Sequence, residues 1–125
     1  MKKIMIMLIT LLFSCNSVKE NNKLTANAAL KIALKALGVK RGDEVITQAF
    51  NFIATIEAIL DIGAKPIIAN VDKSLNIDVS EVKKLISKKT KVIIPVHMLG
   101  VAADLKGLRK VLKKSVLRTL KLNTV

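Results

Sequence analysis

Helical patterns and strand patterns alternate along this chain from residue 24 to residue 114, with short connections between them. The first helical pattern ends at Gly38 and the second ends at Gly63. Strands that alternate with helices at this spacing form mainly parallel sheets covered by helices on both faces. The sequence therefore predicts an α/β fold, a three-layer αβα sandwich. The expected helices span residues 24–37, 51–62, 76–89 and 104 to about 114, and the expected strands span 44–47, 66–71 and 90–96.

Aspartates mark the expected start of two of these helices. Asp78 and Glu81 have the spacing of a capping box, in which the side chain of each residue pairs with the backbone N–H group of the other. Asp104 can cap the last helix, whose apolar residues face one side. These apolar residues are Leu105, Leu108, Val111 and Leu112.

Two phenylalanines, Phe50 and Phe52, lie between the strand at 44–47 and the next helix, although the chain contains only 3 Phe and no Trp or Tyr. Parallel sheets bind ligands beyond the carboxyl ends of their strands. An aromatic ring at such a place can stack on a planar ligand. The residues alone favour Phe50 as a packing residue and leave Phe52 undecided between packing and binding.

Four short motifs resemble one known family. GDEVIT at 42–47, FIAT at 52–55, GAKP at 63–66 and PVHMLG at 95–100 occur in the order and spacing of the DegT/DnrJ/StrS family of pyridoxal-phosphate-dependent sugar aminotransferases. The resemblance runs from about Ala28 to Asp104, well over half of the chain. It implies that residues 24–114 form part of the large domain of a fold-type I transferase that uses pyridoxal phosphate (PLP).

The resemblance also implies a cofactor site. In the family, an aromatic ring after GDEVIT lies against the pyridine ring of the cofactor, and Phe52 is the matching position, which leaves Phe50 as packing. The cofactor phosphate meets a helix N-terminus, where free N–H groups favour an anion. That contact falls on Asn27 and Ala28. Ala26 stands where the family has glycine and Asn27 where it has threonine, so the phosphate site is expected to be altered.

The two catalytic groups of the family have no counterpart in this chain. Transamination needs a lysine that links to the cofactor and an acid that keeps the pyridine nitrogen protonated. The family carries both in segments beyond the matched part, and its pattern places Asp72 at a turn. No catalytic residue is therefore assigned. The expected function is a fragment of a keto-sugar or nucleotide-sugar aminotransferase, inactive by itself. The strand at 91–96 is expected to be an exposed edge, because the sheet of the family continues into strands that this chain lacks.

The resemblance implies a keto-sugar substrate, an amino donor and a homodimer as partners. A formal charge of +13 raises nucleic acid as a further partner. The lysines are scattered, however, and stacking aromatics are few, so no specific nucleic-acid binding is expected. His97 is the only histidine and has no Cys, Asp or Glu at metal-ligand spacing, so no metal site is expected. His97 is instead expected to anchor a loop.

The first 15 residues carry a separate pattern. Two lysines, an apolar run at 4–13 and Cys15 resemble a bacterial lipoprotein signal, and a buried strand fits the same run. The alternative function is therefore a small envelope protein with a binding or structural role, exported and anchored through a lipid on Cys15, which alone would make the membrane a partner. The longer family match favours the cytoplasm. The expected organisation is an apolar segment at 1–23, a partial large domain at 24–114 and a basic tail at 115–125.

Overall fold

The computed structural model describes residues 5–6 and 26–122, and the side chains from residue 27 to residue 114. From residue 26 on, helices and strands alternate in the expected order. The expectations for Cys15 and the rest of 7–25 lie outside the described residues. The elements are β1 (Met5–Ile6), α1 (Ala26–Ala36), β2 (Glu44–Gln48), α2 (Ile53–Asp61), β3 (Lys65–Ala69), α3 (Val79–Leu85), β4 (Thr90–Ile94) and α4 (Leu105–Leu122).

The strands form a parallel sheet in the order β1-β4-β2-β3. β2 pairs with β3 along its whole length, from Glu44 beside Lys65 to Gln48 beside Ala69. On its other side β2 pairs with β4, with a register shift between Glu44 and Val45. Every strand therefore ends at the same edge of the sheet, and this carboxyl edge carries the loops discussed below.

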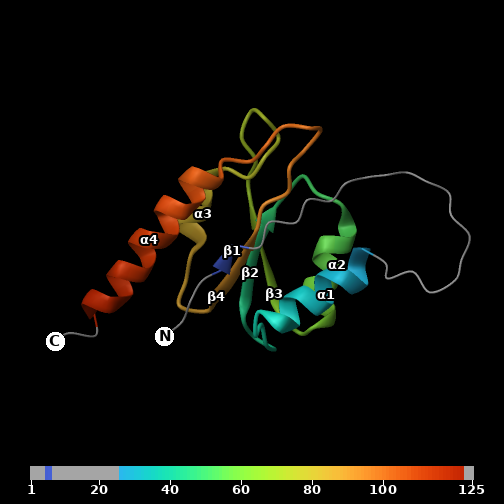
Figure 1. Cartoon of the computed structure of the whole chain (residues 1–125), viewed down its shortest axis with the longest axis horizontal. Coiled ribbons are helices and arrows are strands. Elements are labelled where there is room, and N and C mark those ends of the chain that lie inside the picture. The colour runs from blue at the N-terminus through green and yellow to red at the C-terminus, as the bar shows by residue number, and fades with distance from the viewer. Residues whose placement is uncertain (1–4, 7–25, 123–125) are drawn as a thin grey trace, which may run out of the picture.

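A pair of helices covers each face of the sheet: α1 and α2 on one face, α3 and α4 on the other (Figure 1). Successive strand residues point to opposite faces, so Val45 packs under α1 and α2 while Ile46 packs under α3 and α4. Both side chains are fully buried. The first core cluster comprises Leu34, Val39, Val45, Ile59, Ala64, Val92, Ile94 and Val96, and the second comprises Ile46, Ala69, Ile77, Val82, Ile93, Ala103, Leu108 and Leu112. The predicted αβα sandwich is confirmed.

The C-terminal ends of two helices differ from the prediction by several residues. α3 ends at Leu85, not at 89, because Ser87 and Thr90 form their own turn: the Ser87 N–H donates to Thr90 Oγ1 at 2.9 Å and the Thr90 N–H donates to the Ser87 carbonyl at 3.2 Å. Such local hydrogen bonds compete with the helix. α4 continues past residue 114 to Leu122. At its start the predicted cap is confirmed, since Asp104 Oδ1 accepts from the Gly107 N–H at 2.9 Å.

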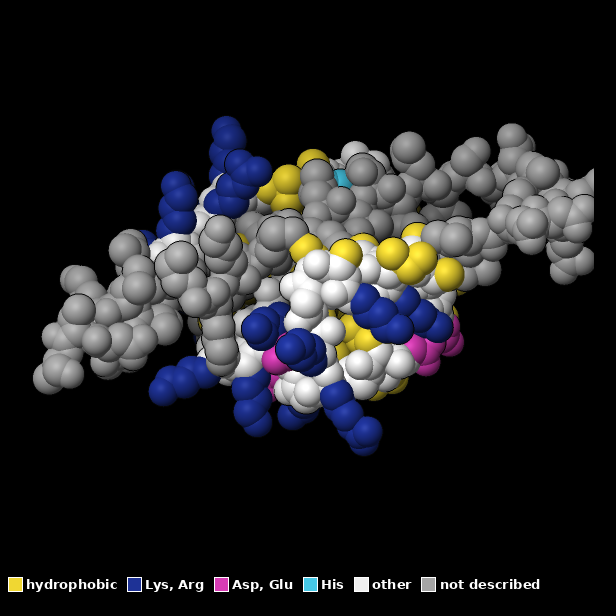
Figure 2. Space-filling view, turned by 60° about the horizontal axis from the view of Figure 1, so that its bottom comes forward, with side chains coloured by type: hydrophobic (Ala, Val, Ile, Leu, Met, Phe, Trp, Pro, Cys, Tyr) yellow, Lys and Arg dark blue, Asp and Glu magenta, His cyan; other side chains and the backbone are white. Residues whose placement is uncertain are grey.

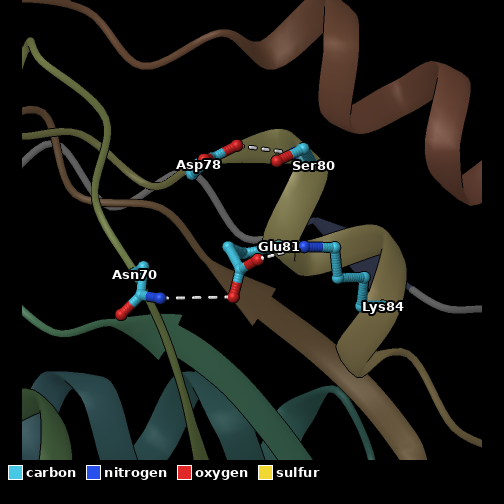
Figure 3. A network of polar contacts seen from close by, with 5 residues as sticks. All are labelled: Asn70, Asp78, Ser80, Glu81 and Lys84. Atoms are coloured by element: carbon cyan, nitrogen blue, oxygen red, sulfur yellow. Dashed lines mark hydrogen bonds and ion pairs between the residues drawn. The ribbon is translucent and has the colours of Figure 1, made fainter.

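Half of the predicted capping box is wrong. Asp78 does cap α3, with Oδ1 accepting from the Ser80 N–H at 2.7 Å. Glu81 does not pair back to Asp78; its carboxylate accepts from Asn70 Nδ2 at 3.3 Å and from Lys84 Nζ at 2.6 Å (Figure 3). The Asp78 N–H donates instead to the Asn70 carbonyl at 3.0 Å. Because Asn70 follows β3 directly, these contacts attach the start of α3 to the end of that strand.

The expectation that the strand at 91–96 is an exposed edge is also wrong. β1 pairs with β4 in parallel, with Met5 beside Val92 and Ile6 beside Ile93. At these two residues β4 therefore has a neighbouring strand on each side, and the N-terminal run forms a strand at Met5–Ile6. The chain itself supplies the strand that the prediction assigned to missing segments.

Candidate functional site

The carboxyl ends of β2 and β4 are adjacent, with Thr47 beside Ile94. From β2 the chain crosses to β3 on one side, and from β3 it returns past β2 to β4 on the other. Crossovers that leave in opposite directions open a crevice at the carboxyl edge, where α/β sheets bind ligands. The loops at 49–52, 70–78 and 95–104 follow the three strands at this edge.

Phe50 and Phe52 are both exposed at this edge, with 47% and 53% of the residue surface accessible. Phe50 is therefore not a packing residue, which corrects the sequence-based interpretation. Its carbonyl oxygen, not its ring, points to the interior, where it accepts from Gln48 Nε2 at 3.0 Å. Phe52 is the N-cap residue of α2 and has extended backbone geometry. Phe52 thus lies in the loop that follows β2, where the resemblance places the cofactor ring.

Asn51 fixes the backbone on which Phe52 stands. Its Oδ1 accepts from the Phe52 N–H at 2.7 Å and from Thr55 Oγ1 at 3.3 Å, and its Nδ2 donates to Thr47 Oγ1 at 3.2 Å. Thr47 in turn donates to the Ile94 carbonyl at 3.1 Å and is completely buried. These bonds connect the start of α2 to the ends of β2 and β4, so they hold the backbone at Phe52 in place.

Gln48 is a fully buried amide that joins three loops. Its Nε2 donates to the carbonyls of Phe50 at 3.0 Å and Leu75 at 3.2 Å, and its Oε1 accepts from the Val96 N–H at 3.0 Å. A buried polar side chain is stable only when its hydrogen-bonding groups are satisfied. Gln48 therefore holds the loops after β2, β3 and β4 at fixed positions.

Asn76 is a second buried amide with the same type of role. Its Oδ1 accepts from the Met98 N–H at 3.0 Å, and its Nδ2 donates to Ser74 Oγ at 3.0 Å and to the Val101 carbonyl at 3.3 Å. His97 lies in the same loop as Met98 and Val101. Its Nδ1 accepts from the Ala103 N–H at 2.9 Å, so it anchors the loop before α4 as predicted.

The sequence interpretation missed Gln48, Asn51 and Asn76. The available signal was a polar residue placed directly after a buried strand, as Gln48 follows the run at 44–47. Such a residue is inward-facing only if the neighbouring loops supply partners, and those partners come from residues that are distant in sequence, such as Leu75 and Val96.

The first turn of α1 lies beside α2. Asn27 Nδ2 donates to Glu57 Oε2 at 3.2 Å, and Lys31 forms an ion pair with Asp61. Both pairs are offset by the same number of residues, so the two helices run parallel and their N-termini lie at the carboxyl edge together. The predicted phosphate-binding residues, Asn27 and Ala28, therefore lie at the same carboxyl edge of the sheet as Phe52.

The two ends of the site fit PLP unequally. Phe52 is half exposed at the carboxyl edge. The Asn27 Oδ1 atom, in contrast, is buried without a hydrogen-bond partner, and it is an acceptor that cannot bind the acceptor oxygens of a phosphate. The donor contact of the same side chain goes to the Glu57 carboxylate. Phe52 is therefore compatible with the cofactor ring, whereas the Asn27 side chain, which contacts the Glu57 carboxylate, is poorly suited to the phosphate.

The Asp72 residue stabilises the turn in which it lies. Its Oδ1 accepts from the Ser74 N–H at 2.7 Å and from the Ser74 hydroxyl at 2.5 Å, and the Leu75 N–H donates to its carbonyl at 3.0 Å. The hydrogen bond from the Ser74 side chain, followed by that from its backbone, holds the pKa of Asp72 below its usual value. The turn that the resemblance implies for Asp72 is confirmed.

Within residues 5–6 and 26–122, no group of three His, Cys, Asp or Glu side chains is arranged to hold a metal ion. In the same part of the chain, no helix has the length and hydropathy needed to cross a membrane. On the face shown in Figure 2, Lys and Arg side chains project at several separate places and do not gather in one patch.

Comparison with known proteins identifies the relatives of this fold. The chain is 46% identical over 87 residues to a pleiotropic regulatory protein of Geobacillus stearothermophilus, covering 69% of this chain and 23% of the relative. It is 43% identical over 82 residues to the GDP-perosamine synthase of Vibrio cholerae, covering 65% and 22%. The crystal structure of NtdA from Bacillus subtilis with its bound cofactor PMP superposes with a TM-score of 0.68 at 36% identity, covering 71% and 21%.

The chain thus spans less than a quarter of the length of each of these relatives. The sequence profile of the DegT/DnrJ/EryC1/StrS aminotransferase family matches residues 22–121. The match covers all elements from α1 to β4 and α4 up to residue 121, but not β1. The chain belongs to the DegT/DnrJ/EryC1/StrS aminotransferase family, of whose fold it contains one part.

Proposed function

We propose that this chain forms the cofactor-ring side of a PLP-dependent sugar aminotransferase, and that alone it binds the cofactor weakly and transfers no amino group. The whole enzyme would act on a keto-sugar and an amino donor, and a homodimer is the expected assembly. The observation that carries the proposal is the exposed Phe52 ring, held at the carboxyl edge by the bonds of Asn51.

The residues of this chain have a positioning role in the proposal. Phe52 would fix the plane of the cofactor ring, while Gln48 and Asn76 hold the surrounding loops. When bound, PLP supplies the electron sink for the amino-group transfer. The lysine and the acid that this chemistry needs are not recognisable among the residues of this chain, and the Asn27 end of the site does not fit the phosphate. Weak binding without turnover follows from these two deficits.

Ring stacking contributes on the order of 1 kcal/mol beyond burial, which corresponds to less than about tenfold in affinity. The test uses pyridoxamine phosphate, because it lacks the aldehyde of PLP and cannot react with the many surface lysines. NMR titration of the chain should give a weak dissociation constant. Phe52→Ala should raise that constant by less than about tenfold.

Phe50→Ala is the matched control, because Phe50 lies two residues away in the same loop and is similarly exposed. It should leave the dissociation constant unchanged. Equal effects of the two substitutions, or no effect of Phe52→Ala, would contradict the role of Phe52 as the ring contact.

We also propose that the chain acts in the cytoplasm, where sugar nucleotides and PLP are found. The pairing of Met5–Ile6 with β4 supports this location, because removal of the residues before Cys15 would remove a strand. Intact-mass measurement of the chain made in a bacterium should show the residues before Cys15 still attached. A chain that starts at a lipid-modified Cys15 would support the exported alternative instead.

A further inference from the structure

We propose that the solvent-facing side of α4 binds the surface of an anionic lipid membrane. Helix α4 lies beside α3 at the outside of the molecule (Figure 1), and it buries Leu108 and Leu112 in the core beneath it. Its opposite side carries exposed cations on each successive turn for which side chains are described. These cations are Lys106, Arg109, Lys110, Lys113 and Lys114.

The positive charge of α4 has no acidic counterpart within the helix. Residues 105–122 contain no Asp or Glu. The nearest acid in the sequence, Asp104, caps the helix by accepting from a backbone N–H group. The ion pairs that the described side chains form lie on other helices, and they are Lys31–Asp61 and Lys84–Glu81. The exposed cations of α4 therefore act together on an external anion.

The stability of the helix does not explain this charge pattern. The helix dipole favours acidic residues in the first turn and basic residues in the last. Helix α3 follows this rule, with Glu81 in its first turn and Lys83 and Lys84 in its last. The first turn of α4 contains Lys106 and no acidic residue. The charges of α4 thus fit an anionic partner better than they fit the helix itself.

A lipid surface suits this helix better than nucleic acid does. Clusters of Lys and Arg on one side of an amphipathic helix bind anionic lipid headgroups mainly through charge. Single-stranded nucleic acid also requires aromatic rings on which the bases stack, and residues 105–122 contain no aromatic residue. The helix would lie on the headgroups without crossing the bilayer. Such a contact would make the membrane a partner without a lipid on Cys15.

The test is sedimentation of the full chain with phosphatidylcholine vesicles that contain about one third phosphatidylglycerol. The chain should bind these vesicles, and a rise in salt from about 0.1 M to about 0.5 M should release it, because salt screens exposed charges. Pure phosphatidylcholine vesicles detect binding through the apolar run at 4–13, which needs no anionic lipid. Equal binding to the two kinds of vesicle would overturn the proposal.

The decisive variant replaces three α4 lysines by glutamine, which retains a good helix propensity. The three lysines form one row along the helix, and they are Lys106, Lys110 and Lys113. Each basic residue near an anionic surface contributes about fivefold to binding, so the partition coefficient onto the anionic vesicles should fall about tenfold or more.

The matched control makes the same change of charge elsewhere on the molecule. It replaces by glutamine three exposed lysines on α1, in the turn before β2 and at the start of β3, and they are Lys35, Lys40 and Lys65. The partition coefficient of this control should fall less than about threefold, because these side chains do not share the surface of α4. Equal losses in the two variants would overturn the proposal, since net charge alone would then explain the binding.

A charge-conserving variant guards against a general effect on folding. The chain with Lys106→Arg, Lys110→Arg and Lys113→Arg should bind the anionic vesicles as the unsubstituted chain does. Loss of binding by this variant, with urea unfolding unchanged, would show that the charge of the row is not what binds.

Duplex DNA of mixed sequence tests the competing partner at the same salt concentration. The chain should bind it more weakly than the anionic vesicles at equal concentrations of phosphate. Tighter binding to the DNA that is lost in the α4 glutamine variant would assign this surface to nucleic acid and overturn the proposal.

Discussion

Gln48 and Asn76 determine the shape of the candidate site although neither side chain reaches the surface. Each residue is at most 1% exposed. Each side chain forms hydrogen bonds with backbone groups of loops other than its own. Gln48 bonds the carbonyl of Phe50, while the backbone at Phe52 is held by Asn51. The residue proposed to contact the ligand, Phe52, is thus distinct from the buried amides that hold the loops, Gln48 and Asn76.

Gln48→Ala should destabilise the chain by about 2–3 kcal/mol, because it leaves the carbonyls of Phe50 and Leu75 and the Val96 N–H without their partner. Gln48→Glu should also destabilise, since a carboxylate accepts from Val96 but cannot donate to two carbonyls. Urea unfolding measures both changes.

The control for Gln48 is Asn70→Ala, which removes an exposed amide at the end of β3 with one side-chain hydrogen bond, to Glu81. It should cost about 0.5 kcal/mol. A Gln48→Ala chain as stable as the Asn70→Ala chain would show that the buried amide does not hold the loops.

Sequence reasoning located Phe52 at the carboxyl edge because the strand and helix patterns around it are unambiguous. It failed for Phe50, because the direction of a loop ring depends on where the loop carbonyls go. The Phe50 carbonyl is drawn inward by Gln48, and that leaves the ring outside. The direction of such a ring is determined by contacts between distant segments, which leave no local sequence pattern.

At the scale of the elements, the order of helices and strands could be predicted. Each segment has a clear hydrophobic periodicity, and glycines mark the ends of the first two helices. The ends could not. α3 stops early where Ser87 and Thr90 bond to each other, and Glu81 turns from the cap of α3 toward Asn70 and Lys84. In both cases a nearby polar group offered an alternative partner. The pairing of β1 with β4 was invisible for another reason, since parallel neighbours are far apart in sequence.

The cap of α3 makes the stability of the chain depend on pH. Hydrogen bonds from Ser80, the side chain first and then the backbone N–H, hold the pKa of Asp78 below its ordinary value. A carboxylate with a lowered pKa stabilises the fold above its unfolded pKa of about 3.9, and this contribution is lost as pH falls through the folded value.

Asp78→Ala should therefore cost about 1 kcal/mol at pH 7, while Asp78→Asn keeps most of the cap. The stability advantage of the unsubstituted chain over the Asp78→Asn chain should disappear as the pH falls below about 4, since only the aspartate titrates. Urea unfolding at neutral and acidic pH measures this. A difference between the two chains that is independent of pH would contradict the assigned role of the Asp78 charge.

At the scale of the whole molecule, the described residues form an αβα layer set that matches only part of the length of the aminotransferase relatives. The two core clusters and the four-stranded sheet are formed within residues 5–6 and 26–114. The aligned part amounts to 22% of the Vibrio cholerae relative. Packing needs only neighbouring layers, whereas catalysis needs groups from distant segments, so the fold of this part does not by itself require the proposed chemistry.

Under the proposed function, this chain holds a cofactor-ring contact without a catalytic apparatus. The direct measurement is incubation of the full chain with PLP, an amino donor and a keto-sugar nucleotide, followed by borohydride reduction, peptide mass mapping and a product assay. The Vibrio cholerae relative is the positive control for the assay.

Under this proposal, we expect a low yield of reduced PLP adducts, spread over many exposed lysines, and no aminated sugar above background. Nearly complete modification of one particular lysine, together with turnover that is lost when that lysine is replaced by alanine, would contradict it.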